Sequence, residues 1–309
     1  MRHLGKLLLL LGIFGIMKIP AWSQTTDTTP RYRVYSADGK PATLNDITAA
    51  WDNYAVVCIG EKHDDPAAHE VEAALFKMAA ERAAASKRPL ALSLEMFERD
   101  VQAVLDEYLA DIISEKHFLL SSRPWNNYQT DYRPLIETAH AQKIPVLAAN
   151  APGRYVNTVA RLGRDSLSRL SPLAKSWLPP LPFPSPSLAY ASKFNALMGL
   201  GVSTAPTMPG AAMHGGGLLD AQTLRDAAMA QSIAEYLKKN SKGFVFQVNG
   251  SFHSEEKLGV PEQIQHYRSN TKVLVVTVVP DDNYPNFSPT LGKLGDFVII
   301  SDAKNPRSF

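Results

Sequence analysis

The alternation of short apolar runs with longer amphipathic segments constrains the fold more than any other feature of the chain. Each run has the length of a strand and is apolar at nearly every position, as is typical of strands buried on both faces of a sheet. In chain order the runs are "YAVVCIG" (54–60), "PLALSLEM" (89–96), "IPVLAAN" (144–150), "FVFQVNG" (244–250) and "KVLVVTVVP" (272–280). Segments of helical periodicity lie between them. The pattern predicts one α/β domain over residues 31–305, in which a mostly parallel sheet is covered by helices on both faces.

Three segments depart from this alternation. Residues 31–44 alternate as a strand does and contain an Asp-Gly turn signal, so they predict a short hairpin. "DFVIIS" (296–301) predicts an edge strand. The stretch 170–219 is rich in Pro, Met and Gly, with "SPLAKSWLPPLPFPSPS" and "MHGGG", which does not suit a strand–helix unit. We interpret 170–219 as an inserted lid or subdomain, because long irregular segments inside compact domains often carry function.

The first residues have the features of a cleaved secretory signal peptide. Arg2 and Lys6 precede the apolar run 7–17, and Ala21-Trp22-Ser23 has small residues where a signal peptidase cleaves. The run is short for a membrane span, although an uncleaved anchor is the alternative interpretation. We therefore expect residues 1–23 to be a signal peptide and the protein to be exported to the periplasm or cell envelope.

Cysteine content and charge exclude several classes of protein. Cys58 is the one cysteine, so no disulfide forms within the chain, and it lies too far from the leader to be a lipid-attachment site. It stands inside an apolar run, where a buried small hydrophobe is expected. Three of the 32 basic residues and none of the 30 acidic ones fall in 1–23, so the remainder has a net charge of −1. Nothing in this balance favours nucleic acid or an anionic membrane surface as a partner.

Polar side chains follow four of the predicted strands at the point where each strand ends. Glu61 and His63 follow the first strand, Glu95 and Asn150 end the second and third, and His253 follows the fourth. The carboxyl ends of parallel strands lie on one edge of a sheet, and ligands bind in the crevice there. These side chains are therefore predicted to line one pocket.

Further residues are predicted near the same edge. Arg154 begins a helix after the third strand, where it is suited to pair with an anionic group. Trp125, Tyr128 and Tyr132 are spaced to lie on one helical face, with core packing against the sheet as the competing interpretation. Asp226, near the start of a later helix, either reaches the crevice or favours the helix N-terminus.

Six segments resemble, in the same order, those of a known family. They are "GEKHDDPAAHEVEAALF", "LSLEMFERDVQAVLDEYL", "WNNYQTDYRPLIETA", "IPVLAANAPGRYVNTVARLG", "RDAAMAQSIAEYL" and "VNGSFHSEEKLGVPEQI". The family is that of the ChaN-like haem-binding proteins, bacterial envelope proteins implicated in haem or iron uptake. It is grouped with the Tiki, TraB and erythromycin-esterase-like proteins. The resemblance spans about residues 31–280, whereas 172–218 looks specific to this chain or a subset.

The resemblance implies a function and a set of pocket residues. Glu61, His63, Glu95 and His253 match the residues that the superfamily places in its pocket. The resemblance implies that the protein binds haem, with a homodimer interface as one place for the haem. It also implies an outer-membrane haem receptor as a partner. Relatives are often lipoproteins with a Cys at the cleavage site. Here Gln24 follows Ser23, so lipid tethering is not predicted.

The inserted segment also suits a porphyrin on chemical grounds. Haem needs a flat apolar slot, an axial ligand and cations for its propionates. Tyr190 and His214 are the two candidates for the axial ligand, and Arg154 is the candidate for a propionate. The methionines of the insert suit adaptable packing or a protein-contact surface equally well. The predicted cofactor-binding residues are Tyr190, His214, Met213, Arg154, Tyr128 and Tyr132.

Three hypotheses follow. The first is an exported haem-binding protein, not an enzyme, that holds haem between the crevice and the inserted lid. The second is a metal-dependent hydrolase in which Glu61, His63, Glu95 and His253 hold a divalent metal, or a metal-free hydrolase with His63 as general base. No Gly-x-Ser-x-Gly elbow is present, which disfavours a serine esterase. The third is a scaffold whose insert docks onto an outer-membrane transporter.

Overall fold

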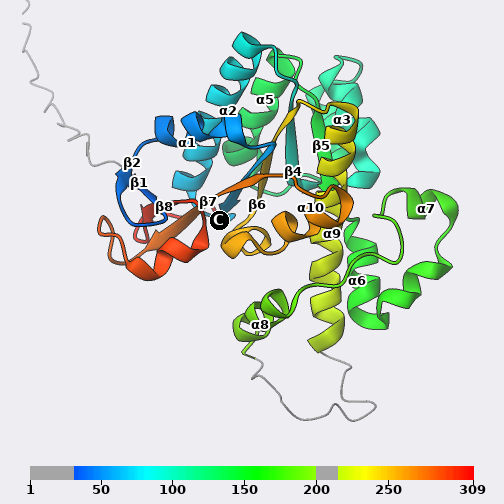
Figure 1. The fold of residues 1–309 in the computed structure, drawn as a ribbon. Coiled ribbons are helices and arrows are strands. Elements are labelled where there is room, and N and C mark those ends of the chain that lie inside the picture. The colour runs from blue at the N-terminus through cyan, green and yellow to red at the C-terminus, as the bar shows by residue number, and fades with distance from the viewer. Residues whose placement is uncertain (1–30, 200–214) are drawn as a thin grey trace, which may run out of the picture. The chain divides into compact units, whose positions relative to one another are not determined.

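A computed structural model describes residues 31–199 and 215–309 (Figure 1). Its centre is one eight-stranded sheet with the strand order β2-β1-β8-β7-β3-β6-β4-β5. The strands are β1 (Tyr32–Ser36), β2 (Pro41–Ala42), β3 (Val56–Glu61), β4 (Leu90–Glu98), β5 (Val146–Asn150), β6 (Phe244–Gly250), β7 (Val273–Asp281) and β8 (Phe297–Asp302). The strands from β8 to β5 pair in parallel, and β1 and β2 pair antiparallel. The predicted mostly parallel α/β sheet is confirmed.

The N-terminal hairpin changes the place of the last strand. β1 and β2 form the predicted hairpin, and β1 also pairs along its whole length with β8. β8 pairs with β7 on its other side. The prediction of an edge strand at 296–301 is therefore wrong, because the hairpin covers the edge that β8 would otherwise expose.

Helices cover both faces of the sheet, and the alternation of side chains along β3 shows how. Val57 and Ile59 pack in one apolar cluster with α2 (Pro66–Ser86) and α5 (Arg133–Ala141). Val56 and Cys58 point the other way. They pack in a second cluster with α9 (Gly215–Lys239) and α10 (Val260–Tyr267). A strand buried on both faces of the sheet needs apolar residues at odd and even positions alike, which is why its sequence shows no alternation.

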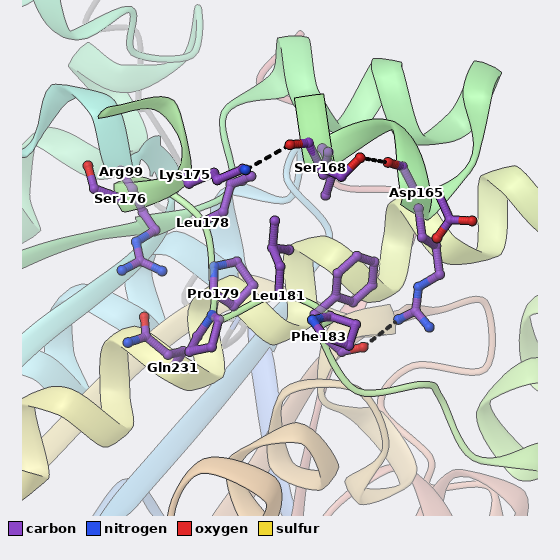
Figure 2. A pocket seen from close by; sticks show the side chains of 14 residues that line it. Arg99, Asp165, Ser168, Lys175, Ser176, Leu178, Pro179, Leu181, Phe183 and Gln231 are labelled. Carbon is purple, nitrogen blue, oxygen red and sulfur yellow. Dashed lines mark hydrogen bonds between the residues drawn. The ribbon is translucent and has the colours of Figure 1, made fainter. Parts of the chain in front are cut away.

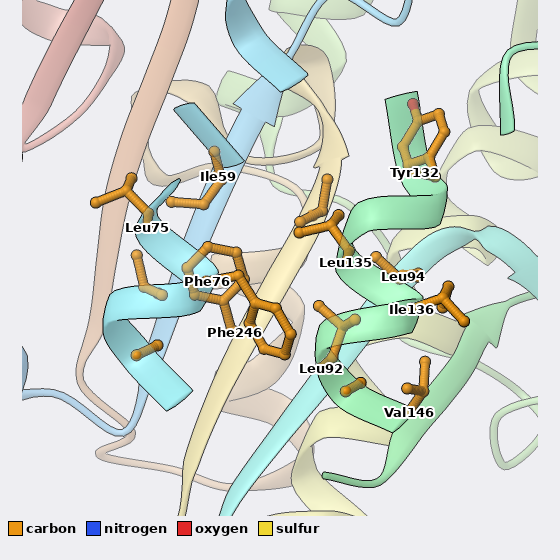
Figure 3. Close-up of a cluster of buried hydrophobic side chains, with 14 of the residues drawn as sticks. Ile59, Leu75, Phe76, Leu92, Leu94, Tyr132, Leu135, Ile136, Val146 and Phe246 are labelled. Carbon is orange, nitrogen blue, oxygen red and sulfur yellow. The ribbon is translucent and has the colours of Figure 1, made fainter. Parts of the chain in front are cut away.

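The larger cluster is the main core of the domain. Figure 3 shows Leu75 and Phe76 of α2 beside Ile59 and Phe246, with Leu135 and Ile136 of α5 beside Leu92 and Val146. These side chains are almost completely excluded from water. Truncating one such leucine to alanine costs about 2–5 kcal/mol, so this face holds the strands in register.

The remaining elements surround this frame. The other α-helices are α1 (Leu44–Ala50), α3 (Gln102–Leu109), α4 (Glu115–Ser122), α6 (Gly153–Leu162), α7 (Pro172–Ser176) and α8 (Leu188–Leu197). Short 3-10 turns occupy Trp51–Asn53, Arg99–Val101, Arg164–Arg169, Ser251–His253, Glu255–Lys257 and Pro289–Leu294, and a π-helical turn occupies Tyr128–Tyr132. Within the described ranges, no helix combines the length and the apolar character that crossing a membrane requires.

The predicted insertion is more helical than its composition indicates. α7 and α8 lie inside it, and α9 begins at Gly215, eight residues before the predicted helix start at 223. A glycine-rich start suits this helix because it crosses α6 closely. A Cβ atom at Gly217 would lie 2.4 Å from the carbonyl oxygen of Ala160. The role of the segment as a lid stays a prediction.

Candidate functional site

The carboxyl ends of β3, β4, β5 and β6 meet around a crevice of about 350 Å³. The register fixes this, because Glu61 at the end of β3 pairs with Gly250 at the end of β6. The crevice is lined by His63, Glu95, Met96, Glu98, Trp125, Asn150, Gln222, Arg225 and His253. The strand-end residues that the sequence singles out therefore lie together. Glu61 lies just beneath this lining and is buried.

Glu61 contacts two histidines and a tyrosine. Its Oε1 atom lies 2.8 Å from His63 Nδ1 and accepts a 2.5 Å hydrogen bond from the hydroxyl of Tyr132. Its Oε2 atom lies 3.1 Å from His69 Nδ1. Burial raises the pKa of Glu61, but the contact with His63 and the charge of His69 outweigh it, so that the pKa is lowered. A buried carboxylate thus stays ionised between two imidazoles.

His69 occupies a closed pocket behind the crevice. Its Nδ1 atom lies 2.9 Å from Glu72 Oε2, and its Nε2 atom lies 3.1 Å from the backbone oxygen of His63 and 3.5 Å from Asp131. Burial alone would lower its pKa, but Glu72 and Glu61 raise it to about 10. Both ring nitrogens face oxygen acceptors, so the imidazole carries two protons at neutral pH.

The same pocket meets a geometric condition for a metal site. Within 31–199 and 215–309, one group of three candidate ligands has its atoms within 4.8 Å of one another, namely Glu61, His69 and Glu72. This group differs from the predicted set of Glu61, His63, Glu95 and His253, with which it shares Glu61. The proton on His69 Nδ1 already lies between the two carboxylates, and burial together with Glu61 raises the pKa of Glu72 well above its usual value. The assignment of a metal to the predicted set stays a prediction.

His253 lies on the opposite side of the crevice between two carboxylates. Its Nδ1 atom is 2.6 Å from Asp226 Oδ1, and its Nε2 atom is 3.3 Å from Glu95 Oε1. Burial would lower the pKa of His253, but Glu95 and Asp226 raise it to about 10. Burial opposes ionisation of Glu95, yet the charge of His253 lowers the Glu95 pKa to about 2. The other Glu95 oxygen accepts a 2.8 Å hydrogen bond from the Gly250 amide, which fixes the carboxylate.

Gly250 also makes room for His63. A Cβ atom at this position would lie 2.9 Å from His63 Nε2. The His63 side chain is 39% exposed, against 4% for His69 and 5% for His253. His63 is therefore the histidine of the three that a ligand in the crevice reaches directly, and Trp125 packs edge-on against its ring at 4.5 Å.

The residues predicted for a cofactor have varied surroundings. Tyr190 is buried, and its hydroxyl donates to Asp226. Tyr132 is buried on Glu61, and Tyr128 is buried against Phe97 and Phe118. These tyrosines line the core rather than the crevice, and a π-helical turn rather than a regular helix carries the latter two. Arg154 pairs with Asp100 at 2.5 Å and stacks over Trp177. Met213 and His214 lie outside the described residues.

Sequence reasoning missed Gln222 and Arg225, both on α9 and both in the crevice wall. Gln222 Nε2 lies 3.0 Å from His253 Nε2. Arg225 makes no hydrogen bond or ion pair with any residue in the described ranges. Residues three apart in a helix lie on the same face, so this spacing could have placed Gln222 and Arg225 together, next to Asp226. The helix was predicted to begin only at 223, which left Gln222 outside it.

An apolar patch adjoins this face of α9. Leu218 stands one turn before Gln222 and is 42% exposed. α8 contacts α9, and at the end of α8 Leu197 and Met198 are 66% and 46% exposed. Exposed apolar side chains on two helices that contact each other are candidates for a binding surface. We call Leu197, Met198 and Leu218 the α8–α9 patch.

The fold and the crevice define a class of protein. It is an α/β protein whose parallel sheet ends in a pocket of histidines oriented by buried carboxylates. The chain belongs to the family described as haem-binding uptake, Tiki superfamily, ChaN, whose model matches residues 47–264. No curated protein sequence matches the chain significantly.

Solved structures are similar to the chain, and the first of those that follow shares its fold. The structure described as cofacial heme binding to ChaN of Campylobacter jejuni is 18% identical, with a TM-score of 0.65 over 88% of this chain and 97% of that chain. The type III effector HopBA1 is 12% identical, with a TM-score of 0.45 over 84% of this chain and 93% of that chain. An erythromycin esterase EreC mutant in its open conformation is 10% identical, with a TM-score of 0.45 over 81% of this chain and 77% of that chain.

Proposed function

We propose that this protein binds haem as cargo in haem or iron uptake, with the porphyrin lying on the α8–α9 patch and its propionates reaching the crevice. Membership of the haem-binding uptake family supports the ligand. The observation that carries the location is the free guanidinium of Arg225 in the crevice wall, beside exposed apolar side chains.

One face of α9 has the order of groups that a porphyrin requires. Leu218, Gln222 and Arg225 follow one another at spacings of four and three, so they share a face. At 1.5 Å per residue, Leu218 and Arg225 are about 10 Å apart along the axis, which is the order of a porphyrin's width. A porphyrin whose ring packs on Leu218 would therefore bring its propionates within reach of Arg225.

Arg225 suits a propionate better than Arg154 does. Arg154 is engaged by Asp100, and binding a propionate would compete with that ion pair. Arg225 has no partner to give up among the described residues, so a propionate would gain a charge-assisted hydrogen bond without breaking one. Arg154 stays the sequence-based candidate and serves as the comparison.

His214 is the better of the two proposed axial ligands. The Tyr190 hydroxyl is buried and bonded to Asp226, and burial beside that carboxylate raises the pKa of Tyr190, which opposes a phenolate ligand. In the sequence His214 immediately precedes Gly215, where α9 begins, and stands four residues before Leu218. A neutral imidazole is a common haem ligand.

The remaining parts of the proposal concern where the protein works. We propose export through residues 1–23, which lie outside the described residues, and action in the periplasm or cell envelope. An outer-membrane haem receptor is the proposed partner. A homodimer that closes over the α8–α9 patch would remove its apolar side chains from water, which supports two chains around the haem.

Hemin titration followed by the Soret band tests this proposal. Arg225→Met is expected to weaken hemin binding about tenfold through loss of one charge-assisted contact. Lys238→Met, an exposed cation at the far end of the same helix, is the matched control and should bind as the wild type does. Leu218→Glu should weaken binding by placing a charge under the porphyrin ring. Absence of saturable binding by the wild type would remove the proposal.

A second measurement separates the axial ligands. His214→Ala is expected to shift the Soret band of the bound hemin, and Tyr190→Phe is expected to leave it in place. The reverse result would assign the ligand to Tyr190. Arg154→Met should bind hemin more tightly than Arg225→Met does.

A hydrolase is the second candidate, because the crevice holds an oriented imidazole. His63 Nδ1 is held by Glu61, and the opposite ring edge faces the crevice beside Gly250. Burial lowers the pKa of His63, but Glu61 outweighs burial and the pKa is raised. Glu95 and Asp226 keep His253 protonated at neutral pH, so His253 is suited to stabilise negative charge rather than to ligate a metal.

Metal content and inhibition separate the two forms of the hydrolase. In the metal-free form, cleavage of an activated ester would be lost in His63→Ala and unaffected by EDTA. In the metal form, the purified protein would carry one divalent metal per chain that is lost in His63→Ala and His253→Ala. Equal rates for wild type and His63→Ala would remove both forms.

A further inference from the structure

A second cavity lies apart from the crevice, between α9 and the segment 164–183 (Figure 2). Its volume is about 900 Å³, and none of its lining residues lines the crevice. This volume lies in the range of sites that hold small organic ligands. The residues that line it come from the inserted segment and from parts of the frame that the proposed haem site does not use.

Three cations line the cavity, and two of them are already engaged. Arg164 donates to the backbone oxygens of Phe183 and Pro184 at 2.9 and 2.8 Å and to the Ser185 hydroxyl at 3.0 Å. Lys175 donates to the backbone oxygen of Ser168 at 2.7 Å. Both cations hold the wall of the cavity together and have little capacity left for a ligand.

Arg99 is the third cation, and it differs from the other two. It makes no hydrogen bond or ion pair with any residue of the described ranges, and its Nη1 atom is buried without a partner. Burial lowers the pKa of Arg99 to about 10, so the guanidinium is still charged at neutral pH. The charge of Glu235 offsets part of this burial, but Nη1 has no hydrogen-bond acceptor, and an anion at that atom would relieve the remaining cost.

Polar groups lie at both ends of the cavity. Figure 2 shows Arg99, Ser176 and Gln231 at one end, and Asp165 and Ser168 beside Phe183 at the other. The Oε1 atom of Gln231 is also buried without a hydrogen-bond partner in the described residues, so its carboxamide is free to reorient toward a ligand.

An apolar stretch of the wall is formed by Leu178 to Phe183. Leu178 and Phe183 are 4% and 3% exposed and belong to an apolar cluster with α6 and α9. Pro179, Pro180 and Pro182 have no backbone N–H to donate, so this wall offers few donors to a ligand. An apolar chain fits such a wall, and a sugar or nucleotide does not.

We propose that this cavity binds a small amphipathic monocarboxylate, with its carboxylate on Arg99 and Gln231 and its apolar body along Leu178 and Phe183. Glu235 interacts with Arg99 and Asp165 lines the opposite end, so a singly charged carboxylate is favoured over a doubly charged phosphate. The site is independent of the proposed haem site, so either proposal can fail without the other.

Calorimetric titration of the full chain with octanoate, and with 1-octanol as the uncharged probe of equal chain length, tests this proposal. Octanoate is expected to bind once per chain. Arg99→Met should weaken octanoate at least about tenfold through loss of a charge-assisted contact and leave octanol unchanged. Arg169→Met removes an exposed cation of the same segment outside the cavity and should change neither.

Two further measurements locate the binding. Ser176→Trp, at the exposed rim, is expected to abolish binding of both probes by filling the end that holds Arg99. Arg99→Met should bind hemin as the wild type does. The proposal is overturned by the absence of saturable octanoate binding, by equal octanoate affinity in Arg99→Met, or by binding that survives Ser176→Trp.

Discussion

Glu61 holds two histidines, and they face different surroundings. His63 stands at the crevice with its side chain 39% exposed, whereas His69 lies 4% exposed in the closed pocket behind it. Both rings lie within hydrogen-bonding distance of the same carboxylate. The difference teaches that the same pair of residue types has two uses here. The buried pair joins helix α2 to β3, and the exposed pair orients a side chain at the crevice.

The partners on the far side of each ring explain this division. His69 is bonded at both nitrogens, to Glu72 and to the backbone oxygen of His63, so it has no position left for a ligand. The Nε2 atom of His63 packs over Gly250, where a Cβ atom would lie only 2.9 Å away. Both nitrogens of His69 are thus used by buried partners, whereas the more exposed His63 ring is bonded through Nδ1.

Removing the shared carboxylate is the harshest test of the comparison. Glu61→Ala would leave His69, Tyr132 and Glu72 without their common partner in a buried pocket. We expect a loss of about 4 kcal/mol in the free energy of unfolding, measured by urea denaturation at neutral pH, because an uncompensated buried charge is costly.

The surface acid of the same helix provides the control. Glu70 pairs with Arg31 in solvent, and both side chains are more than 40% exposed. Glu70→Ala should change the free energy of unfolding by less than about 1 kcal/mol. Equal losses for the two variants would mean that the Glu61 network contributes no more than a surface ion pair.

Replacing each histidine separately sharpens the division. His69→Ala is expected to cost about 3 kcal/mol of unfolding free energy, because it strands two buried carboxylates. His63→Ala should cost less than about 1 kcal/mol, since solvent replaces the exposed ring. The order of the two effects should reverse when hemin binding or ester cleavage is measured. His63→Ala should change these activities more than a folded His69→Ala protein does.

Stability at alkaline pH distinguishes the two histidines in another way. Glu72 and Glu61 raise the folded-state pKa of His69 from 6.5 to about 10. The folded state therefore holds a proton that the unfolded chain has lost, and its stabilising contribution is full below pH 6.5 and lost as the pH rises through 10. The slope is about −1.4 kcal/mol per pH unit for one proton, or about 3 kcal/mol between pH 7 and 9.

The measurement is the free energy of unfolding against pH in wild type and in His69→Gln. In His69→Gln, the free energy of unfolding should fall less steeply with pH, by about the contribution of one proton to the slope. His63→Gln should flatten it less, because solvent screens the more exposed ring. A wild-type curve that is level between pH 7 and 9 would mean that neither His69 nor His253 holds its extra proton.

The sequence predicted the frame of the crevice and part of its chemistry. Near-continuous apolar runs indicate strands buried on both faces, so the residues after them had to lie on one edge. Glu61 and His63 were predicted to share the crevice because both come at the carboxyl end of the first strand. Glu95 and His253 followed from the same rule applied to their own strands.

The remaining partners depend on how the helices pack. Asp226 meets both His253 and Tyr190, which are 27 and 36 residues away along the chain. No local spacing encodes such contacts, since the angle at which α9 crosses the sheet sets them. The edge position expected for β8 failed for a similar reason, because a hairpin from the other end of the chain pairs with it.

Two neighbouring tyrosines test the comparison at its smallest scale. Both were predicted to touch a cofactor, and both are buried, but the Tyr132 hydroxyl donates to Glu61 and the Tyr128 hydroxyl has no hydrogen-bond partner in the described residues. Tyr132→Phe should cost about 1.5 kcal/mol of unfolding free energy, and Tyr128→Phe should lie within about 0.5 kcal/mol of the wild type. Urea denaturation of both variants resolves this difference. A tyrosine that lines a haem plane would instead change the Soret band when its hydroxyl is removed, so an unchanged hemin spectrum in both variants would assign the pair to the core.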